Sequence, residues 1–183
     1  MRNYIALLFA ILAVGCQTPY HTSYFYFPSK TNLISISSRG FHYQKPDSWV
    51  SWSSSVFDDS SNRPGEMLSV RAYEWSPIIH FNTLTNSVRW QDDLPRMDAE
   101  IIRRSRLQDI QTSEELTHYN KFTGHGVRKV GKSDNLRFEY ILFYPEGEMT
   151  GTRIIIILCG SPNNASLREM DEIIHSVYYI PNS

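Results

Sequence analysis

Residues 153–159 of this 183-residue chain read RIIIILC, and this run decides how the neighbouring sequence is interpreted. Five consecutive aliphatic residues are typical of a central strand that is covered on both faces. The run at 136–144 supports the same arrangement, because alternate residues share a face in a strand and both of its faces are apolar. One face carries Phe138, Tyr140, Leu142 and Tyr144, and the other carries Ile141 and Phe143.

Four β-prone runs occupy this half of the chain, at residues 108–119, 126–131, 136–144 and 151–159. Short connections rich in turn residues join them, at 120–124, 132–135 and 145–150. Connections of this length and composition favour hairpins between strands that are neighbours in the sequence. The sequence therefore predicts an antiparallel meander.

Two helices are expected around this meander. The first starts at Asp92 and Asp93, whose charge and oxygen atoms suit a helix N-terminus. Its apolar stripe is Leu94, Met97, Ile101 and Ile102. Arg103, Arg104 and Arg106 lie on the opposite face, which we expect to be solvated, with binding of an anionic lipid or phosphate as the alternative. The last helix has Ser166 and Glu169 at the spacing of a capping box. Its stripe is Leu167, Met170, Ile173, Ile174 and Val177, which we expect to pack on the sheet.

The part of the chain before the first helix reads mainly as strands. Alternation and β-prone residues predict strands at 32–38, 41–44, 49–57 and 67–75, with a turn at 45–49 and a loop at 58–65. Residues 76–87 are expected to form a loop with a short element. The fold class is therefore α+β, an antiparallel sheet flanked by helices.

The composition is that of an ordinary folded domain. Hydrophobic residues make up 41% and aromatic residues 13% of the chain, which is enough to bury a core and excludes a disordered chain. The 18 Lys and Arg residues are balanced by 19 Asp and Glu residues. Because a domain that binds phosphate backbones usually shows a basic excess, we expect no nucleic-acid partner.

Residues 1–15, MRNYIALLFAILAVG, have the layout of a secretory signal. One positive charge at Arg2 precedes a short apolar run and small residues. A membrane span needs about 20 apolar residues, so the run is too short for one. A buried N-terminal helix is the alternative, and the lack of a polar face argues against it.

The end of this segment, Ala13-Val14-Gly15-Cys16, resembles the bacterial lipobox. The resemblance implies cleavage between Gly15 and Cys16, a diacylglycerol on the Cys16 sulfur and acylation of the new N-terminus. Several acyl chains anchor stably, whereas one chain binds only marginally. Gln17 then favours the outer membrane in a Gram-negative host. This covalent lipid on Cys16 is the only attached group that we expect, with no other cofactor.

These observations divide the chain into a signal peptide at 1–15, a lipidated cysteine with its tether or edge segment at 16–31, and one α+β domain at 32–183. The aromatic residues 24–27 are expected either to pack as an edge strand or to touch lipid headgroups. Once Cys16 is lipidated, Cys159 has no partner for a disulfide. We expect the core to bury it.

The order of elements resembles the PsbP-like family of α/β/α sandwiches, which includes the bacterial DcrB-like lipoproteins. The resemblance rests on an aromatic residue followed by Pro46-x-x-Trp49 and on Ile173-Ile174-His175-Ser176 near the end. In this family the two motifs are packing signatures. The resemblance implies a binding or assembly factor of the cell envelope, and it transfers no catalytic residue to this chain.

The sequence contains one candidate metal site. His118 and His125 flank a hairpin turn and would need a third ligand, such as Glu114 or Asp134, to hold a metal ion. The chain contains no HExxH, Cys-x-x-Cys or G-x-S-x-G pattern. We therefore expect a non-catalytic envelope lipoprotein that binds another envelope protein. The alternatives are a lipid- or metal-binding lipoprotein, with its groove between the sheet and the mid-chain helix, and an envelope hydrolase.

Overall fold

The computed structural model describes residues 33–38, 40–53, 68–71, 77–85, 88–162 and 164–181. The expected signal peptide, its cleavage point at Gly15 and Cys16, the aromatic segment 24–27 and the loop 58–65 lie outside these residues. In the described part of the chain, no helix is long and apolar enough to cross a membrane.

The predicted meander is confirmed as part of a seven-stranded sheet, in the order β3 (Val50–Ser53), β4 (Leu68–Arg71), β5 (Ile78–Thr83), β9, β8, β7 and β6. Its four strands are β6 (Gln108–Tyr119), β7 (Phe122–Ser133), β8 (Leu136–Pro145) and β9 (Thr152–Cys159). Consecutive strands pair antiparallel. Asp134 and Asn135 both have positive φ and form a two-residue turn, because short polar side chains tolerate the left-handed region.

The other half of this sheet contains β3 (Val50–Ser53), β4 (Leu68–Arg71) and β5 (Ile78–Thr83). β5 pairs with β9 along its whole length. The prediction of a loop with a short element at 76–87 was wrong, because β5 is a central strand. Its polar residues His80 and Asn82 obscured the pattern, since they are buried instead of facing solvent.

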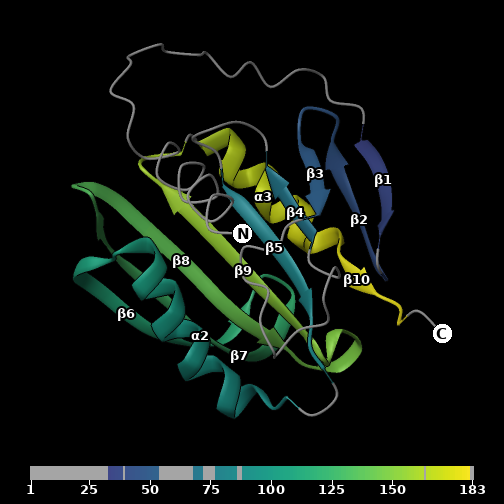
Figure 1. The fold of residues 1–183 in the computed structure, drawn as a ribbon. Coiled ribbons are helices and arrows are strands. Elements are labelled where there is room, and N and C mark those ends of the chain that lie inside the picture. The colour runs from purple at the N-terminus through teal and green to yellow at the C-terminus, as the bar shows by residue number, and fades with distance from the viewer. Residues whose placement is uncertain are drawn as a thin grey trace, which may run out of the picture.

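The two helices cover opposite faces of the sheet (Figure 1). Met97 and Ile101 of α2 (Trp90–Ser105) pack with Tyr140, Leu142 and Tyr144 of β8. On the other face, residues of α3 (Asn164–Ser176) pack with the alternate residues of β8 and β9. That second cluster contains Ile141, Phe143, Ile154, Ile156, Met170, Ile173 and Ile174. The predicted α+β sandwich, with helices flanking an antiparallel sheet, is confirmed.

A smaller sheet with the order β1-β2-β10 lies beside α3. It consists of β1 (Leu33–Ser38), β2 (Phe41–Pro46) and β10 (Tyr178–Tyr179), all antiparallel. Phe41 and Tyr43 attach it to the core, with ring centroids 5.5 Å and 5.7 Å from that of Phe81 in β5. The smaller sheet therefore shares the core of the α3 face.

Both predicted helix starts were displaced. α2 begins at Trp90, and Asp93 is buried within its first turn. α3 begins at Asn164, so Ser166 lies inside the helix and is not its N-cap. Ser166 and Glu169 are both buried. The capping-box prediction was wrong because Glu169 faces the core, where it accepts a hydrogen bond from Trp49.

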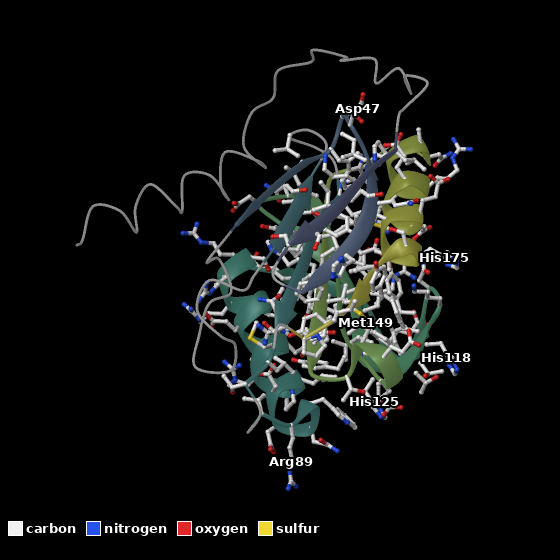
Figure 2. The ribbon with its side chains drawn as sticks, turned by 90° about the vertical axis from the view of Figure 1, so that its right-hand side faces the viewer. Asp47, Arg89, His118, His125, Met149 and His175 are labelled. Carbon is white, nitrogen blue, oxygen red and sulfur yellow. The ribbon has the colours of Figure 1, made fainter. Side chains whose placement is uncertain are left out.

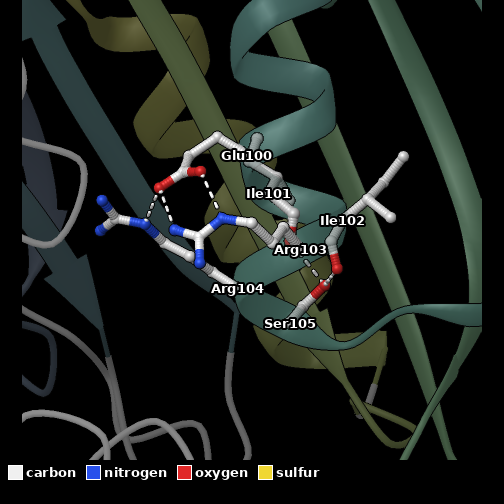
Figure 3. A network of polar contacts seen from close by, with 6 residues as sticks. All are labelled: Glu100, Ile101, Ile102, Arg103, Arg104 and Ser105. Atoms are coloured by element: carbon white, nitrogen blue, oxygen red, sulfur yellow. Dashed lines mark hydrogen bonds and ion pairs between the residues drawn. The ribbon is translucent and has the colours of Figure 1, made fainter.

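A single carboxylate partly compensates the basic end of α2, as Figure 3 shows. Glu100 accepts two 2.8 Å hydrogen bonds from Arg103 and a further one from Arg104. These bonds outweigh the small desolvation of the carboxyl and lower the pKa of Glu100 to about 2. Arg103 is largely exposed, as expected for a solvated face.

The prediction that the core buries Cys159 was only partly correct. Cys159 is the last residue of β9 and is half-buried. The strand leaves the core at this point, and the backbone turns at Gly160, which has a φ of +71°.

Candidate functional site

A groove of about 490 Å³ lies where the smaller sheet meets α3. Strands β1 and β2 contribute one wall, α3 contributes the other, and the tip of the β6–β7 hairpin reaches one side. Its lining residues are Leu33, Gln44, Pro46, Asn120, Arg168, Asp171, Glu172, Ile173, His175 and Ser176. It lies on the α3 face, opposite the mid-chain helix α2 beside which the sequence suggested a ligand groove.

Ser176 fixes the position of α3 against β2. The backbone amide of Gln44 donates a 2.8 Å hydrogen bond to Ser176 Oγ. Ser176 Oγ in turn lies 3.2 Å from the backbone carbonyl oxygen of Gln44. Strands β10 and β2 pair Tyr178 with His42, and the same register brings Ser176 opposite Gln44. Ser176 is still the last residue of α3, so its backbone does not pair with β2. Its hydroxyl instead makes the contacts to Gln44 that the backbone of a strand residue would make there.

Trp49 holds the middle of α3. Its backbone amide donates a 3.0 Å hydrogen bond to the Pro46 carbonyl oxygen, which closes the turn after β2. Its indole Nε1 donates a buried 2.8 Å bond to Glu169 Oε2. Pro46, Trp49 and Ser176, which carried the family resemblance, thus set the spacing between β2 and α3.

The β6–β7 turn completes the groove. Asn120 has a φ of +54°, and its side-chain amide donates a 3.0 Å hydrogen bond to the carbonyl oxygen of Asp171. Its Oδ1 lies 3.3 Å from Nδ1 of His175. No local sequence pattern indicates this contact, because the partners are about fifty positions apart.

The groove carries charges of both signs. Arg168, Asp171 and Glu172 are exposed on α3 and line it. Partial burial removes water from the Asp171 carboxyl and raises its pKa. Since a partly dehydrated carboxylate gains from a cationic partner, this side of the groove favours a basic group.

A second polar group lies buried beneath α2 and serves the fold. Arg153 Nη1 donates a 2.6 Å hydrogen bond to Asp93 Oδ2, and both side chains are fully buried. Tyr144 donates a 2.7 Å bond to the same oxygen, and Arg96 binds Oδ1. Burial alone would raise the pKa of Asp93, but Arg153 and these hydrogen bonds outweigh it and lower that pKa.

His80 of β5 shares this environment. Burial, and secondarily the charge of Arg153, lower the pKa of His80 to about 3. The imidazole is therefore neutral at any physiological pH. The buried group of Asp93, Arg153 and His80 was not predicted from the sequence. Arg153 indicates it, because a charged residue at the start of a buried apolar run needs a buried counter-charge.

The structure separates the two histidines that were weak metal candidates (Figure 2). His125 stacks on Trp90 with centroids 3.7 Å apart, and its Nε2 lies 3.2 Å from Glu146. His118 is exposed on β6 and bonds to Thr117. Across the described ranges, no group of three potential ligands lies close enough to hold a metal ion.

The suggested third ligands are also placed elsewhere. Glu114 of β6 lies 3.8 Å from Arg128 on β7. Asp134 belongs to the exposed turn between β7 and β8. The predicted lipidation residue, Cys16, lies outside the described residues, so its site stays a prediction.

Comparisons with known proteins give no family for the chain. No protein-family model matches it, and no curated protein matches it either. It is similar to solved structures of 9–12% sequence identity, among them a protein from Bacteroides thetaiotaomicron with 10% identity and a TM-score of 0.47. That match covers 84% of this chain and 50% of the other, so the chain spans about half the length of that protein.

Two other solved structures are matched over their whole length. Cyanobacterial PsbP (CyanoP) from Synechocystis has 9% identity and a TM-score of 0.48 over 89% of this chain. LpqN of Mycobacterium tuberculosis, a protein involved in cell envelope biogenesis, has 12% identity and a TM-score of 0.44 over 90% of this chain.

Proposed function

We propose that this chain is a lipid-anchored cell-envelope protein that binds another envelope protein through the groove and catalyses no reaction. The N-terminal sequence supports the anchor, with an apolar signal that ends in a lipobox at Cys16. The observation that carries the binding role is the groove between the smaller sheet and α3.

The groove suits a protein surface. Seven of its lining residues are exposed, namely Leu33, Gln44, Asn120, Arg168, Asp171, Glu172 and His175. Leu33, which is 58% exposed, provides apolar contact, and Ile173 lies buried at the base. A small apolar centre within a polar rim is the usual composition of a protein interface. Asp171 and Glu172 favour a basic side chain on the partner.

The anchor and the groove are close along the chain. Sixteen residues, 17–32, separate Cys16 from Leu33, which lines the groove. At about 3.3 Å per residue, the chain from Cys16 to Leu33 reaches at most roughly 55 Å. A lipid on Cys16 would therefore hold the groove within reach of partners at the membrane surface.

The anchor is tested with Cys16→Ala. We expect the wild-type protein to fractionate with membranes and to carry the mass of acyl chains, and the variant to lose both properties. A variant that stays with the membranes, together with a wild-type protein without acyl mass, would remove the anchor from the proposal.

The groove is tested with a photo-crosslinking amino acid at Glu172, in cells that make the lipidated chain. The matched control carries the same group at Gln111, which is exposed on β6 and away from the groove. We expect a discrete adduct from position 172 that decreases when Asp171 is replaced by Lys. Equal adducts from both positions would contradict a specific interface.

Small-ligand binding is the second candidate. A volume of about 490 Å³ lies within the range of small-molecule sites, which is roughly 300–1,000 Å³. A bound molecule that copurifies with the chain, and is lost from a folded Leu33→Glu variant, would favour this function, because Leu33 lines the groove and is exposed.

A further inference from the structure

Strand β1 forms an open edge of the smaller sheet. It pairs with β2 along all six of its residues, and within the described ranges no strand pairs with its other edge. Its sequence, LISISS, contains no charged residue and no proline. Its pairing with β2 contains no bulge. Charged residues, prolines and bulges are the devices with which proteins usually prevent an edge strand from pairing with another chain, and β1 has none of them.

The larger sheet shows the opposite treatment of an edge. Its edge strand β6 carries exposed Asp109, Glu114 and Glu115. Two register shifts interrupt its pairing with β7. The same molecule therefore protects one edge with charge and irregularity and leaves the other flat and uncharged.

The exposed apolar residues of β1 lie at this open edge. Ile36 packs against the core that contains α3, whereas Ile34, two residues earlier on the same face, is 40% exposed. Leu33 is 58% exposed on the other face. Another strand added beside β1 would cover Ile34 and extend the core by one strand.

We propose that this strand is the β1 of a second copy of the chain, paired antiparallel about a two-fold axis perpendicular to the sheet. Such an axis keeps each face on its own side, so residues of the same face meet. One register covers the apolar residues on both faces. It pairs Ile34 with Ile36 twice, Leu33 with Ser37 twice, and Ser35 with Ser35.

The chemistry of β1 favours its own copy as the partner. Two uncharged strands meet without like-charge repulsion, and the Ile34–Ile36 pairs are of the apolar cross-strand kind that stabilises sheets. The pairing also brings a second copy beside Leu33, which lines the groove. A dimer of this kind would therefore form one side of the proposed binding site.

The contact between the two β1 strands is small, so its strength depends on the local concentration of the two copies. Pairing of five residues buries much less than the roughly 1,200–2,000 Å² of a stable interface, so we expect weak association in solution. Confinement to one membrane raises the effective concentration of the two copies. Only this enhancement depends on the proposed lipid anchor.

Cysteine crosslinking tests the register. Directly opposed residues in an antiparallel pair have Cα atoms about 4.5–5.5 Å apart, within reach of a disulfide. In a Cys159→Ser background, Ser35→Cys is expected to give a covalent dimer in membranes under mild oxidation. The matched control is Ser37→Cys, which is also exposed on β1 and is displaced from its own copy by four residues in this register.

A third variant tests the strand edge itself. Ile34→Lys introduces the charge that protected edges carry, and we expect it to reduce the Ser35→Cys crosslink about tenfold or more, without loss of the folded far-ultraviolet circular dichroism spectrum. The Cys16→Ala form of Ser35→Cys, concentrated in solution, should crosslink more slowly than the membrane form.

The outcomes separate this dimer from the anchor. If the Cys16→Ala protein crosslinks in concentrated solution as fast as the protein with Cys16 does in membranes, the anchor is rejected and the dimer is retained. Equal crosslinking at positions 35 and 37, a Ser35→Cys adduct with a different protein, or no dimer in either preparation would overturn the proposal.

Discussion

Trp49 donates a buried 2.8 Å hydrogen bond from its indole Nε1 to Glu169, which lies 120 positions later in the chain. The bond connects the turn after β2 to the middle of α3. It thereby ties the N-terminal strands to the C-terminal helix across the shared core.

The first prediction concerns this bond. Trp49→Phe removes the donor and leaves a small void, so we expect the free energy of unfolding to fall by about 2–4 kcal/mol. The measurement is urea unfolding followed by circular dichroism. Glu169→Gln retains an acceptor oxygen and should lose clearly less. Equal stability of Trp49→Phe and the wild type would show that the bond contributes nothing.

The second prediction concerns the buried ion pair beneath α2. Asp93→Ala leaves the Arg153 guanidinium buried without its carboxylate, which costs about 3–5 kcal/mol. The control is Arg96→Ala, which removes a partner with 43% exposure of its side chain and should lose about 1 kcal/mol or less. Thermal unfolding of the three proteins measures both values. The prediction fails if the two variants are equally stable.

The third prediction is a pH dependence that originates at His80. The unfolded chain binds a proton at His80 near pH 6.5, whereas the folded chain does so only near its pKa of about 3. This contribution to stability is therefore complete above pH 6.5 and is lost as the pH falls toward 3. Between pH 7 and pH 5 it amounts to about 2 kcal/mol.

Urea unfolding of wild-type protein and His80→Gln at these two pH values tests that contribution. The wild type should lose about 2 kcal/mol more than the variant between pH 7 and pH 5. Parallel pH profiles would show that His80 is protonated in the folded state as easily as in the unfolded state.

The fourth prediction concerns the hydroxyl that joins α3 to β2. Ser176→Ala leaves the Gln44 amide without its acceptor, and we expect a loss of about 1 kcal/mol. Hydrogen exchange of the Gln44 amide should accelerate, while that of amides in β8 should change only with global stability. Unchanged protection of the Gln44 amide in Ser176→Ala would contradict the role of the hydroxyl.

The meander could be predicted from the sequence because its signals are local. Alternation of apolar residues and short connections rich in turn residues, such as Asp134-Asn135, define each hairpin without reference to distant parts of the chain. Strand β5 escaped prediction because His80 and Asn82 are buried on the α2 face, and a strand with buried polar residues does not alternate in the usual way. Strand β10 escaped because its two residues pair with His42 and Phe41, far away in the sequence.

The candidate site was predictable only in its components. The resemblance marks Pro46, Trp49 and Ser176 as packing residues. Trp49 and Ser176 bond across to α3 and β2, and the Pro46 carbonyl closes the turn that carries Trp49. The groove between these elements depends on tertiary contacts such as that of Asn120 with Asp171, which no spacing in the sequence encodes.

The position of β2 has a consequence for when this protein folds. Its two edges are bound by β1, near the start of the described chain, and by β10, only a few residues from the end. A chain that emerges from a ribosome or an export channel with its N-terminus first reaches β10 and the end of α3 last. The β1–β2 hairpin can therefore form early, whereas the second edge of β2 and the groove are completed only after α3 and β10 have followed.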